Sequence, residues 1–530
     1  MLGDLVRLAY VVARRLCQAV RVHAPEVLAA YRAEDVQAAV ARVLARVPDG
    51  SLMVRAATGL AVTCAEVLRE RRGRVSGGHV VLLVGSGNNG GDALLAGARL
   101  RRRGVRAEAL LVGDRAYEPG LTALLDAGGR VIDARSAKGR KAGVTVLASA
   151  DLVIDGVVGT GGSAGLQAPA DELVDAIPPG VAVVSVDLPS GVDPDTGETP
   201  GKHVLADVTV ACGALSPSVL VPPASHAAGR IVFVDVGTAR ELQPPPAVQR
   251  LSPAGVAARW PVPRRHDHKY TRGVLGVVAG SDMYPGAAVL ACAGAVRAGV
   301  GIVRYVGPEH VTSQVLTARP EVVPGLGRVQ AWLLGSGVEE DEQQDAAIDE
   351  ALNSGLPCVV DAGALEACVR RRASDSRAAS ADDVLLTPHA GELARMLAML
   401  GHDVTREQVE AKPMRHAFWL ARDADATVLL KGHHTLIASP GGQLFSQAEG
   451  PAWLATAGSG DVLAGIAGTL MASGVKAPWA GAMAALIHGR AAARASQGGP
   501  IAASEIADAT PATIAGLLNL KKSVPHPVAQ

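Results

Sequence analysis

Residues 80–92 read Val-Val-Leu-Leu-Val-Gly-Ser-Gly-Asn-Asn-Gly-Gly-Asp, and a helical pattern follows from Ala93 to Arg102. A short apolar run that enters a glycine-rich turn and then a helix is typical of a parallel strand buried on both faces. Similar apolar runs occur at residues 151–154, 181–186 and 231–234. Together they predict a Rossmann-like, three-layer α/β/α domain over residues 31–240.

A second series of buried strands is predicted in the other half of the chain, at residues 274–278, 331–334, 357–360, 384–386 and 427–430. It ends in a helical stretch at about 478–496 and predicts a second α/β domain over residues 266–520. Residues 241–265 hold a proline cluster and are predicted as a linker, and residues 370–383 as a flexible loop. We expect residues 1–30 to form an extension or helix and residues 521–530 a loose tail.

Composition narrows the function classes. The 530 residues carry 51 Lys and Arg against 51 Asp and Glu, which gives no electrostatic reason to expect a nucleic-acid partner. No apolar run approaches the roughly 18 to 20 residues of a membrane span, so no membrane partner is expected. Six cysteines without a Cys-x-x-Cys pair indicate neither a zinc site nor a disulfide framework, and favour the cytoplasm.

Polar side chains and glycines recur where the strands of the first half end. Asp155 closes one strand and precedes the glycine-rich segment 159–165, and Asp187 closes the next strand, shortly before Ser190. A single such Asp is commonly a helix cap or turn residue. Recurrence at several strand ends instead predicts a ligand site, because ligands of open α/β sheets bind at the carboxyl edge.

The second half contains a motif suited to phosphate. Gly458-Ser459-Gly460-Asp461 runs directly into the apolar helical stretch 462–470. Free N–H groups and the positive end of a helix dipole attract an anion there, and the carboxylate beside them can act as a general base. A glycine loop that only turns the chain is the simpler reading of this motif alone. His266 and His268 lack a third ligand and are expected in a solvated loop.

The double-Asn segment, the loop at 159–165 and the Asp187-Leu-Pro-Ser190 segment together resemble the N-terminal epimerase domain of the NAD(P)HX repair enzymes, the YjeF-type family, which act on hydrated NADH and NADPH. The resemblance implies a potassium ion held by Asn89, Asp155 and Ser190, and Asp187 as catalytic acid or base. It implies substrate contacts from Asn88, Asn89, Gly90, Gly91, Asp92, Gly159, Thr160, Gly161, Gly162, Ser163, Ala164, Gly165 and Asp187.

The second half resembles the ribokinase-like dehydratase domain of the same repair system, through residues 284–288, 335–337, 386–392, 430–435 and 457–461. The resemblance implies ADP as cosubstrate, accompanied by a magnesium ion, with Asp461 taking the proton of the substrate hydroxyl. Substrate contacts are implied for Ala287, Gly337, His389 and Asp461, and nucleotide contacts for Lys431, Gly432, His433, His434, Thr435 and Gly460.

The chain departs from the family pattern at several positions. Ser86 and Ala93 stand where the family usually has Pro and Gly, and Ser216 replaces a Lys in a Leu-Lys-Pro segment. An Asp-Ala-Asp-Ala segment of the family is Asp361-Ala-Gly363-Ala here. The Ser216 replacement removes a charged side chain near the first site.

We therefore expect a bifunctional enzyme that epimerises R and S NAD(P)HX, dehydrates the S form with ADP, and assembles as a homo-oligomer. One alternative is a ribokinase-type small-molecule kinase whose first domain only binds. Another leaves the first domain as a binding or assembly module. A stable phosphorylated alcohol as product would favour the kinase, whereas unchanged epimer exchange in Asp187→Asn would favour the binding module.

Overall fold

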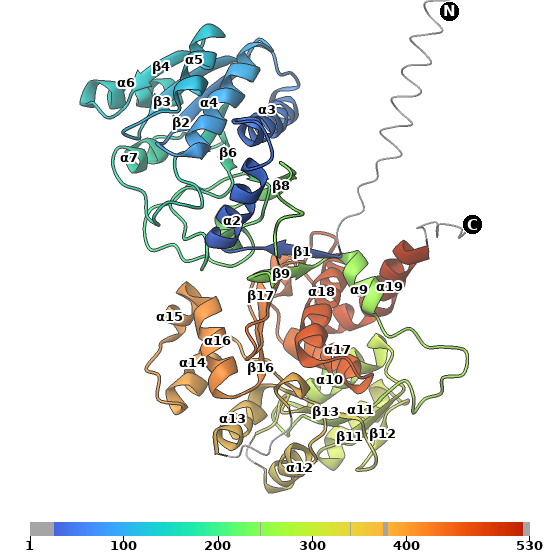
Figure 1. Cartoon of the computed structure of the whole chain (residues 1–530). Helices are drawn as coiled ribbons and strands as arrows, with labels where there is room; N and C mark the ends of the chain where they lie inside the picture. The colour runs from blue at the N-terminus through green and yellow to red at the C-terminus, as the bar shows by residue number, and fades with distance from the viewer. Residues whose placement is uncertain (1–25, 244, 340, 375–379, 523–530) are drawn as a thin grey trace, which may run out of the picture.

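The computed structural model describes residues 26–243, 245–339, 341–374 and 380–522. In these residues the strands form two sheets, of seven and eleven strands. Figure 1 shows two lobes, the first coloured blue to green and the second yellow to red, with helices packed on each sheet. This architecture confirms the predicted fold class, two α/β domains with a Rossmann-like first half and a ribokinase-like second half.

The first sheet is parallel throughout and has the order β4-β3-β2-β5-β6-β7-β8. Its strands are β2 (His79–Val84), β3 (Arg106–Leu111), β4 (Arg130–Asp133), β5 (Leu152–Gly156), β6 (Ala182–Val186), β7 (Val208–Cys212) and β8 (Arg230–Val234). The four predicted strands correspond to β2, β5, β6 and β8. The order reverses between β2 and β5, which is where doubly wound sheets bind ligands.

The helices that pack against the first sheet are α3 (Ser51–Arg72), α4 (Asn88–Arg101), α5 (Glu118–Asp126), α6 (Ala137–Leu147) and α7 (Ala170–Asp175). The same domain also contains α2 (Ala33–Leu44) and α8 (Ala224–Ala227). Among the described helices only α3 is long and apolar enough by composition to cross a membrane. Its residues Leu60, Cys64 and Leu68 are fully buried in the hydrophobic core beside the sheet, the position of a core helix.

The second sheet has the order β1-β9-β18-β17-β16-β15-β14-β13-β10-β11-β12. Its strands are β1 (Val27–Ala30), β9 (Val248–Leu251), β10 (Val274–Val278), β11 (Ile302–Val306), β12 (Val323–Pro324), β13 (Ala331–Leu334), β14 (Cys358–Val360), β15 (Val384–Leu386), β16 (Thr427–Leu430), β17 (Thr435–Ala438) and β18 (Leu444–Gln447). The five predicted strands correspond to β10, β13, β14, β15 and β16, which lie side by side and parallel.

The helices around the second sheet are α9 (Pro253–Arg259), α10 (Pro285–Ala298), α11 (Glu309–Ala318), α12 (Glu342–Asn353), α13 (Leu365–Ser374), α14 (Ala390–Met399), α15 (Arg406–Ala411), α16 (Pro413–Asp423), α17 (Ser459–Ala472), α18 (Ala477–Ser496) and α19 (Ala503–Lys522). Glycines bring α10 and α17 close together: a Cβ added at Gly465 would lie 2.3 Å from the Ala291 carbonyl oxygen. This contact fixes the position of α17 and therefore of its N-terminus.

Four boundary predictions differ from the structure in the described residues. Residues 241–265 are not a plain linker, because β9 and α9 lie in them, and residues 27–30 form β1 rather than a helix. The predicted loop 370–383 is helical at its ends, in α13 and in the 3₁₀ helix Ala381–Asp383. Helix α19 continues to Lys522, into the predicted tail. The rest of these predictions, at residues 1–25, 375–379 and 523–530, falls outside the described residues.

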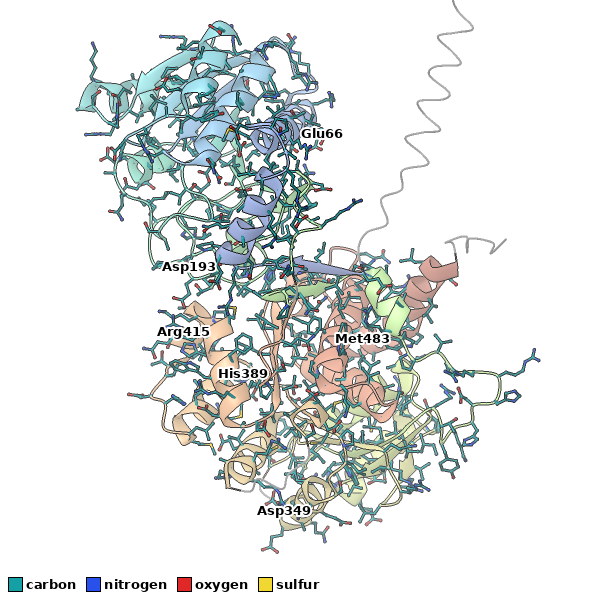
Figure 2. The ribbon with its side chains drawn as sticks, in the orientation of Figure 1. Glu66, Asp193, Asp349, His389, Arg415 and Met483 are labelled. Atoms are coloured by element: carbon teal, nitrogen blue, oxygen red, sulfur yellow. The ribbon has the colours of Figure 1, made fainter. Side chains whose placement is uncertain are left out.

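The two domains are joined by paired strands and by side chains. Strand β1 pairs antiparallel with β9, and Ala30 lies opposite Val248. The Leu220 carbonyl oxygen of the first domain accepts hydrogen bonds from Arg250 at 3.0 Å and from Ser446 Oγ at 2.5 Å. On another side, Arg415 in α16 pairs with Glu198 at 2.8 Å, and in Figure 2 Arg415 and Asp193 lie on facing surfaces of the two lobes.

Candidate functional site

The glycines of the double-Asn segment predicted a turn before the helix. In the structure this segment is instead the first turn of helix α4, which begins at Asn88. The glycines allow this turn to pack tightly on the strand ends. A Cβ at Gly85 would lie 1.9 Å from the Val157 carbonyl oxygen, and one at Gly90 would lie 2.3 Å from the Gly85 carbonyl oxygen. The helix N-terminus therefore sits at the switch point between β2 and β5, where its free N–H groups favour an anion.

Two carboxyl groups, the buried Asp92 and the partly buried Asp187, lie within electrostatic reach of each other at this point. Burial, followed by the charge of Asp187, raises the pKa of Asp92 to about 8. Burial raises the pKa of Asp187 to about 6, although a hydrogen bond from the Cys212 N–H at 3.1 Å opposes the shift. Within the described residues, the buried Oδ1 of Asp92 has no hydrogen-bond partner. The site thus holds one carboxyl protonated at neutral pH beside one that is mostly ionised.

The backbone of Asp187 supports a functional role for this residue. Its φ of 65° lies in the left-handed region, which a residue with a side chain rarely adopts. The Asp187 N–H donates to the Val210 carbonyl oxygen at 2.8 Å, which holds the turn after β6 in this conformation. Strain of this kind clusters at functional sites, where the surrounding structure must maintain it.

The three residues expected to hold potassium converge behind this pair. Asp155 is completely buried and accepts hydrogen bonds from Ser190 Oγ at 2.5 Å and from Ser185 Oγ at 2.7 Å. Asn89 is also buried and donates from Nδ2 to the Val186 carbonyl oxygen, which leaves its Oδ1 facing Gly159. Within the described residues Asp155 forms no ion pair with Lys or Arg. Amide, carboxylate and hydroxyl oxygens around a carboxylate without a cationic partner suit a hard cation.

The remaining predicted residues of the first site form its rim. A Cβ at Gly159 would lie 2.6 Å from Asn89 Oδ1, so the loop that starts there closes over the helix N-terminus. Thr160 to Ala164 are at least partly exposed, and the Gly165 N–H donates to the Gly191 carbonyl oxygen at 2.8 Å. Asn88 is exposed, unlike Asn89. The loop therefore offers backbone amides beside the acidic pair.

Ser216 occupies the position of the family Lys and points into protein. It is buried, its Oγ donates to the Pro194 carbonyl oxygen at 2.5 Å, and it lies 2.9 Å from Ser218 Oγ. The replacement leaves a satisfied hydroxyl instead of an ammonium group. Any positive charge needed by the first site must come from another source.

In the second domain, Asp461 lies in the first turn of α17, as predicted. Gly458 has φ 82°, and a Cβ there would lie 2.4 Å from Leu290 Cδ1, so glycine is required for the turn into the helix. Burial, followed by the charge of Asp361, raises the pKa of Asp461 to about 7. This carboxyl group can therefore accept a proton near neutral pH.

Lys431 brings a positive charge to the same point. A Cβ at Gly460 would lie 3.6 Å from Lys431 Nζ, so the ammonium group adjoins the first turn of α17. Lys431 Nζ lies 2.9 Å from Asp361 Oδ1 and 3.8 Å from Glu392 Oε2. A helix N-terminus and a lysine side by side form an anion site.

Asp361 is the functional residue that the sequence predictions omitted. It is buried at the end of β14 and accepts hydrogen bonds from Thr387 Oγ1 at 2.8 Å and from Ser336 Oγ at 3.3 Å. Burial would raise its pKa, yet the charge of Lys431 and these hydrogen bonds hold the pKa below its usual value. Its position directly after a buried strand was the available signal. Gly363, the altered family position, packs so that a Cβ would lie 2.4 Å from the Val338 carbonyl oxygen.

The other predicted residues of the second site lie around this cluster. His389 caps helix α14: its Nδ1 accepts from the N–H groups of Gly391 and Glu392, so a neutral ring carries its proton on Nε2. It also forms a β-bridge with Lys431. Gly337 and Ala287 are in contact, since a Cβ on Gly337 would lie 2.5 Å from Ala287 Cβ.

The loop between β16 and β17 begins at Lys431 and holds other residues predicted to contact the nucleotide. Gly432 is exposed and Thr435 partly exposed, which leaves their backbone accessible. The rings of His433 and His434 contact the ring of His226 in the first domain, at centroid distances of 5.1 and 5.2 Å. Sequence offered no sign of this contact, because His226 lies in the other domain.

Comparisons with known proteins match both halves of the chain. A family model described as NAD(P)H-hydrate dehydratase matches residues 275–511, and one described as YjeF-related protein N-terminus matches residues 49–218. The bifunctional NAD(P)H-hydrate repair enzyme Nnr of Mycobacterium tuberculosis (strain ATCC 25618 / H37Rv) is 43% identical over 452 residues, which cover 84% of this chain and 89% of the relative. The enzyme of that name from Mycobacterium leprae is 43% identical over 477 residues, 87% of this chain and 93% of the relative.

Among solved structures, the ADP/ATP-dependent NAD(P)H-hydrate dehydratase of Bacillus subtilis, co-crystallised with ATP and Mg²⁺, is similar to the chain. It is 28% identical, with a TM-score of 0.45, and the match covers 50% of this chain and 97% of that one.

Proposed function

The chain belongs to the family of bifunctional NAD(P)H-hydrate repair enzymes, and on this premise we propose how its two sites divide the repair. The first domain interconverts the R and S hydrates of NADH and NADPH. The second removes the hydroxyl group of the S hydrate at the expense of ADP. Because dehydration consumes one epimer only, the first reaction feeds the second.

In the second domain, Asp461 acts as the general base. It takes the proton of the C6 hydroxyl as the hydroxyl oxygen bonds to the β-phosphorus of ADP and the bond from this phosphorus to the bridging oxygen breaks, releasing AMP. Phosphate then leaves C6 and a proton leaves C5, so that the products are NAD(P)H, AMP and phosphate. The observation that carries this proposal is the placement of Asp461 beside Lys431 in the first turn of α17.

The surroundings of Asp461 supply the rest of this reaction. Lys431, with the N–H groups of the first turn of α17, offsets the charge that develops on the phosphoryl oxygens. Backbone groups at Gly432, Thr435 and Gly460 line the path of the nucleotide. The carboxylates of Asp361 and Glu392 near Lys431 are oxygen donors of the kind that Mg²⁺ takes, and such an ion would neutralise phosphate charge when bound with the nucleotide.

In the first domain, Asp92 and Asp187 work as an acid and a base. The protonated Asp92 donates a proton to the departing C6 hydroxyl, which leaves as water while the ring nitrogen shares its lone pair with C6. Water then adds from the opposite face and gives its proton to Asp187. The separation of their pKa values, about 8 and about 6, supports these roles.

Potassium is the proposed ion at Asn89, Asp155 and Ser190. These residues would hold it through an amide, a carboxylate and a hydroxyl oxygen. When bound, it would supply a positive charge that the buried Ser216 does not. Asp155 supports this assignment, because it is buried and forms no ion pair with Lys or Arg among the described residues.

The test uses a mixture of R and S hydrates with ADP, ATP or no nucleotide, and follows recovery of NADH by its absorbance. Wild type with ADP should recover nearly all of it. Asp187→Asn should stop at the S fraction, while Asp461→Asn should recover almost none but still exchange the epimers. Wild-type recovery that ends at the S fraction would refute the epimerase role, and recovery without nucleotide would refute the role of ADP.

A further inference from the structure

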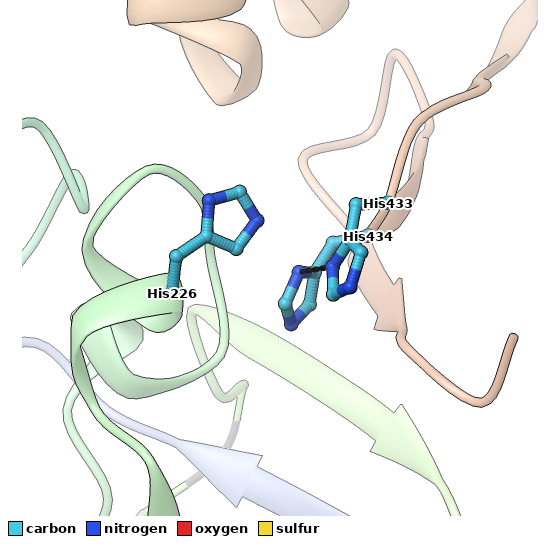
Figure 3. A group of neighbouring side chains, drawn as sticks. All are labelled: His226, His433 and His434. Carbon is cyan, nitrogen blue, oxygen red and sulfur yellow. Dashed lines mark hydrogen bonds between the residues drawn. The ribbon is translucent and has the colours of Figure 1, made fainter. Parts of the chain in front are cut away.

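Three histidine side chains from the two domains face one another at the domain junction (Figure 3). His226 lies in helix α8 of the first domain, and His433 and His434 lie in the loop between β16 and β17 of the second. One ring nitrogen of each lies within 4.8 Å of the other two. No part of the reaction proposed above uses these three rings.

Hydrogen bonds on one side and strand pairing on the other hold the backbone around this cluster. Leu220, shortly before α8, accepts the hydrogen bonds from Arg250 and Ser446 that join the domains. His433 and His434 are held between strands β16 and β17, which pair directly with each other. The histidines therefore meet on ordered elements rather than on chain ends.

The spacing of the ring nitrogens suits one metal ion. His433 Nδ1 and His434 Nδ1 are 3.3 Å apart. Two imidazole nitrogens bound to one tetrahedral zinc ion, each at about 2.0 to 2.1 Å, lie about 3.3 to 3.4 Å from each other. Small rotations of the His226 ring about its side-chain bonds would bring the third nitrogen from within 4.8 Å to that distance.

The charged groups around the three rings also bear on metal binding. Arg250 lies within electrostatic reach of His434. Arg250 opposes any cation here, but Glu449 offsets its charge. Three imidazoles without a carboxylate select zinc or a similar transition metal over magnesium or potassium.

We propose that His226, His433 and His434 bind one divalent transition-metal ion, of which Zn²⁺ is representative, and that this ion ties the first domain to the nucleotide loop of the second. Water completes the tetrahedron. The side chains of His433 and His434 then serve the metal, whereas the backbone of the same loop and Lys431 remain available to the nucleotide. The ion links the positions of the two domains and takes no part in the bond changes.

The test uses untagged full-length protein stripped with a chelator and then titrated with Zn²⁺ or Co²⁺. We expect one ion per chain, a tetrahedral Co²⁺ absorption spectrum and a Zn²⁺-dependent rise in Tm. His226→Ala should weaken Zn²⁺ binding at least ~10-fold, since even outer-shell partners of a ligand are worth about 10- to 100-fold. The matched control His266→Gln removes an exposed histidine elsewhere and should bind Zn²⁺ as wild type does.

Hydrogen exchange separates a bridging ion from a local one. Zn²⁺ should protect residues around 220–228 and around 431–436 together in wild type, and neither segment in His226→Ala. A second variant, His433→Gln with His434→Gln, should also lose the stoichiometric ion. Equal Zn²⁺ binding by wild type and His226→Ala, or protection of residues 431–436 alone, would overturn the proposal without affecting the repair chemistry.

Discussion

Both sites enclose carboxyl groups, but within the described part of the chain only the second site pairs one of them with a lysine. Each places buried carboxyl groups at the carboxyl edge of a parallel sheet, beside the N-terminus of a helix. In the second domain Asp361 has a partner, Lys431, at 2.9 Å. In the first domain, among the described residues, neither Asp155 nor Asp187 forms an ion pair with Lys or Arg. A buried carboxylate without a cationic partner takes up a proton or a metal ion. A buried carboxylate beside a lysine stays ionised, and the lysine is held where it can also contact phosphate.

The largest expected effect tests the role of the second site as the one that performs dehydration. Asp461→Asn removes the proton acceptor, and loss of general acid–base catalysis costs about 10² to 10⁴ in rate. We expect the dehydration kcat to fall by this amount with ADP binding little changed. Single-turnover kinetics with pure S hydrate measures it. Asp187→Asn is the matched control and should leave dehydration of pure S hydrate at the wild-type rate; equal loss in both variants would contradict the division of labour.

Removing Lys431, the charge partner of Asp361, should leave the second site with an unpaired carboxyl group, as in the first site. Lys431→Met leaves Asp361 buried without its charge partner, and breaking a buried pair costs about 3 to 5 kcal/mol. We expect a clear fall in the free energy of unfolding of the second domain, measured by urea denaturation. The double variant Lys431→Met/Asp361→Asn should regain most of the loss. A single variant as stable as wild type would show that the pair contributes nothing.

The different pKa values of Asp92 and Asp187 should appear in the pH dependence of epimerisation. Asp187 must be ionised to accept a proton, so kcat/KM should rise with pH through about 6. Asp92 must be protonated to donate one, so kcat/KM should fall above about 8. Epimer exchange followed by chromatography at constant potassium measures both limbs, each about tenfold per pH unit. In Asp92→Asn the upper limb should vanish; its persistence would assign that limb to another group.

The smallest effect concerns stability in the second site. The pKa of Asp461 is about 7 when folded and near 3.9 when unfolded, so the folded chain holds a proton that the unfolded chain releases. Stability from this group is present at low pH and is lost as pH rises to about 7. Without nucleotide, the Tm of wild type should therefore fall relative to that of Asp461→Asn between pH 5 and pH 8. A constant difference in Tm would show that Asp461 titrates normally.

Sequence reasoning located the parallel strands well and the remaining ones poorly. The predicted strand at residues 274–278 matches β10, because burial on both faces leaves an unbroken apolar run. Strands β1 and β9 escaped notice because they are four residues each and interrupted by polar side chains in β9. Their pairing joins distant parts of the chain, which no local pattern reveals.

The site residues divide in the same way: those in local motifs were predicted, and those brought together by the fold were not. Asp461 and Asp187 were predicted from local motifs, and the structure places each beside a helix N-terminus. The partnership of Asp361 with Lys431, and the meeting of His226 with His433, depend on which strand ends and loops become neighbours. That information lies in the topology of the sheets rather than in residue spacing. The start of α4 at Asn88 was missed because glycines argue against a helix unless the turn must pack closely.

The antiparallel pairing of Ala30 with Val248 makes β1 and β9 the two arms of a single hairpin whose loop is the whole of residues 31–247. The chain thus enters and leaves the epimerase domain at adjacent points, as an inserted domain does. Replacing residues 31–247 by a two-residue Asn-Gly turn should close the hairpin directly. The outcome would be a freestanding dehydratase with its outermost strand still in place, whereas a cut between the domains would strip that strand away.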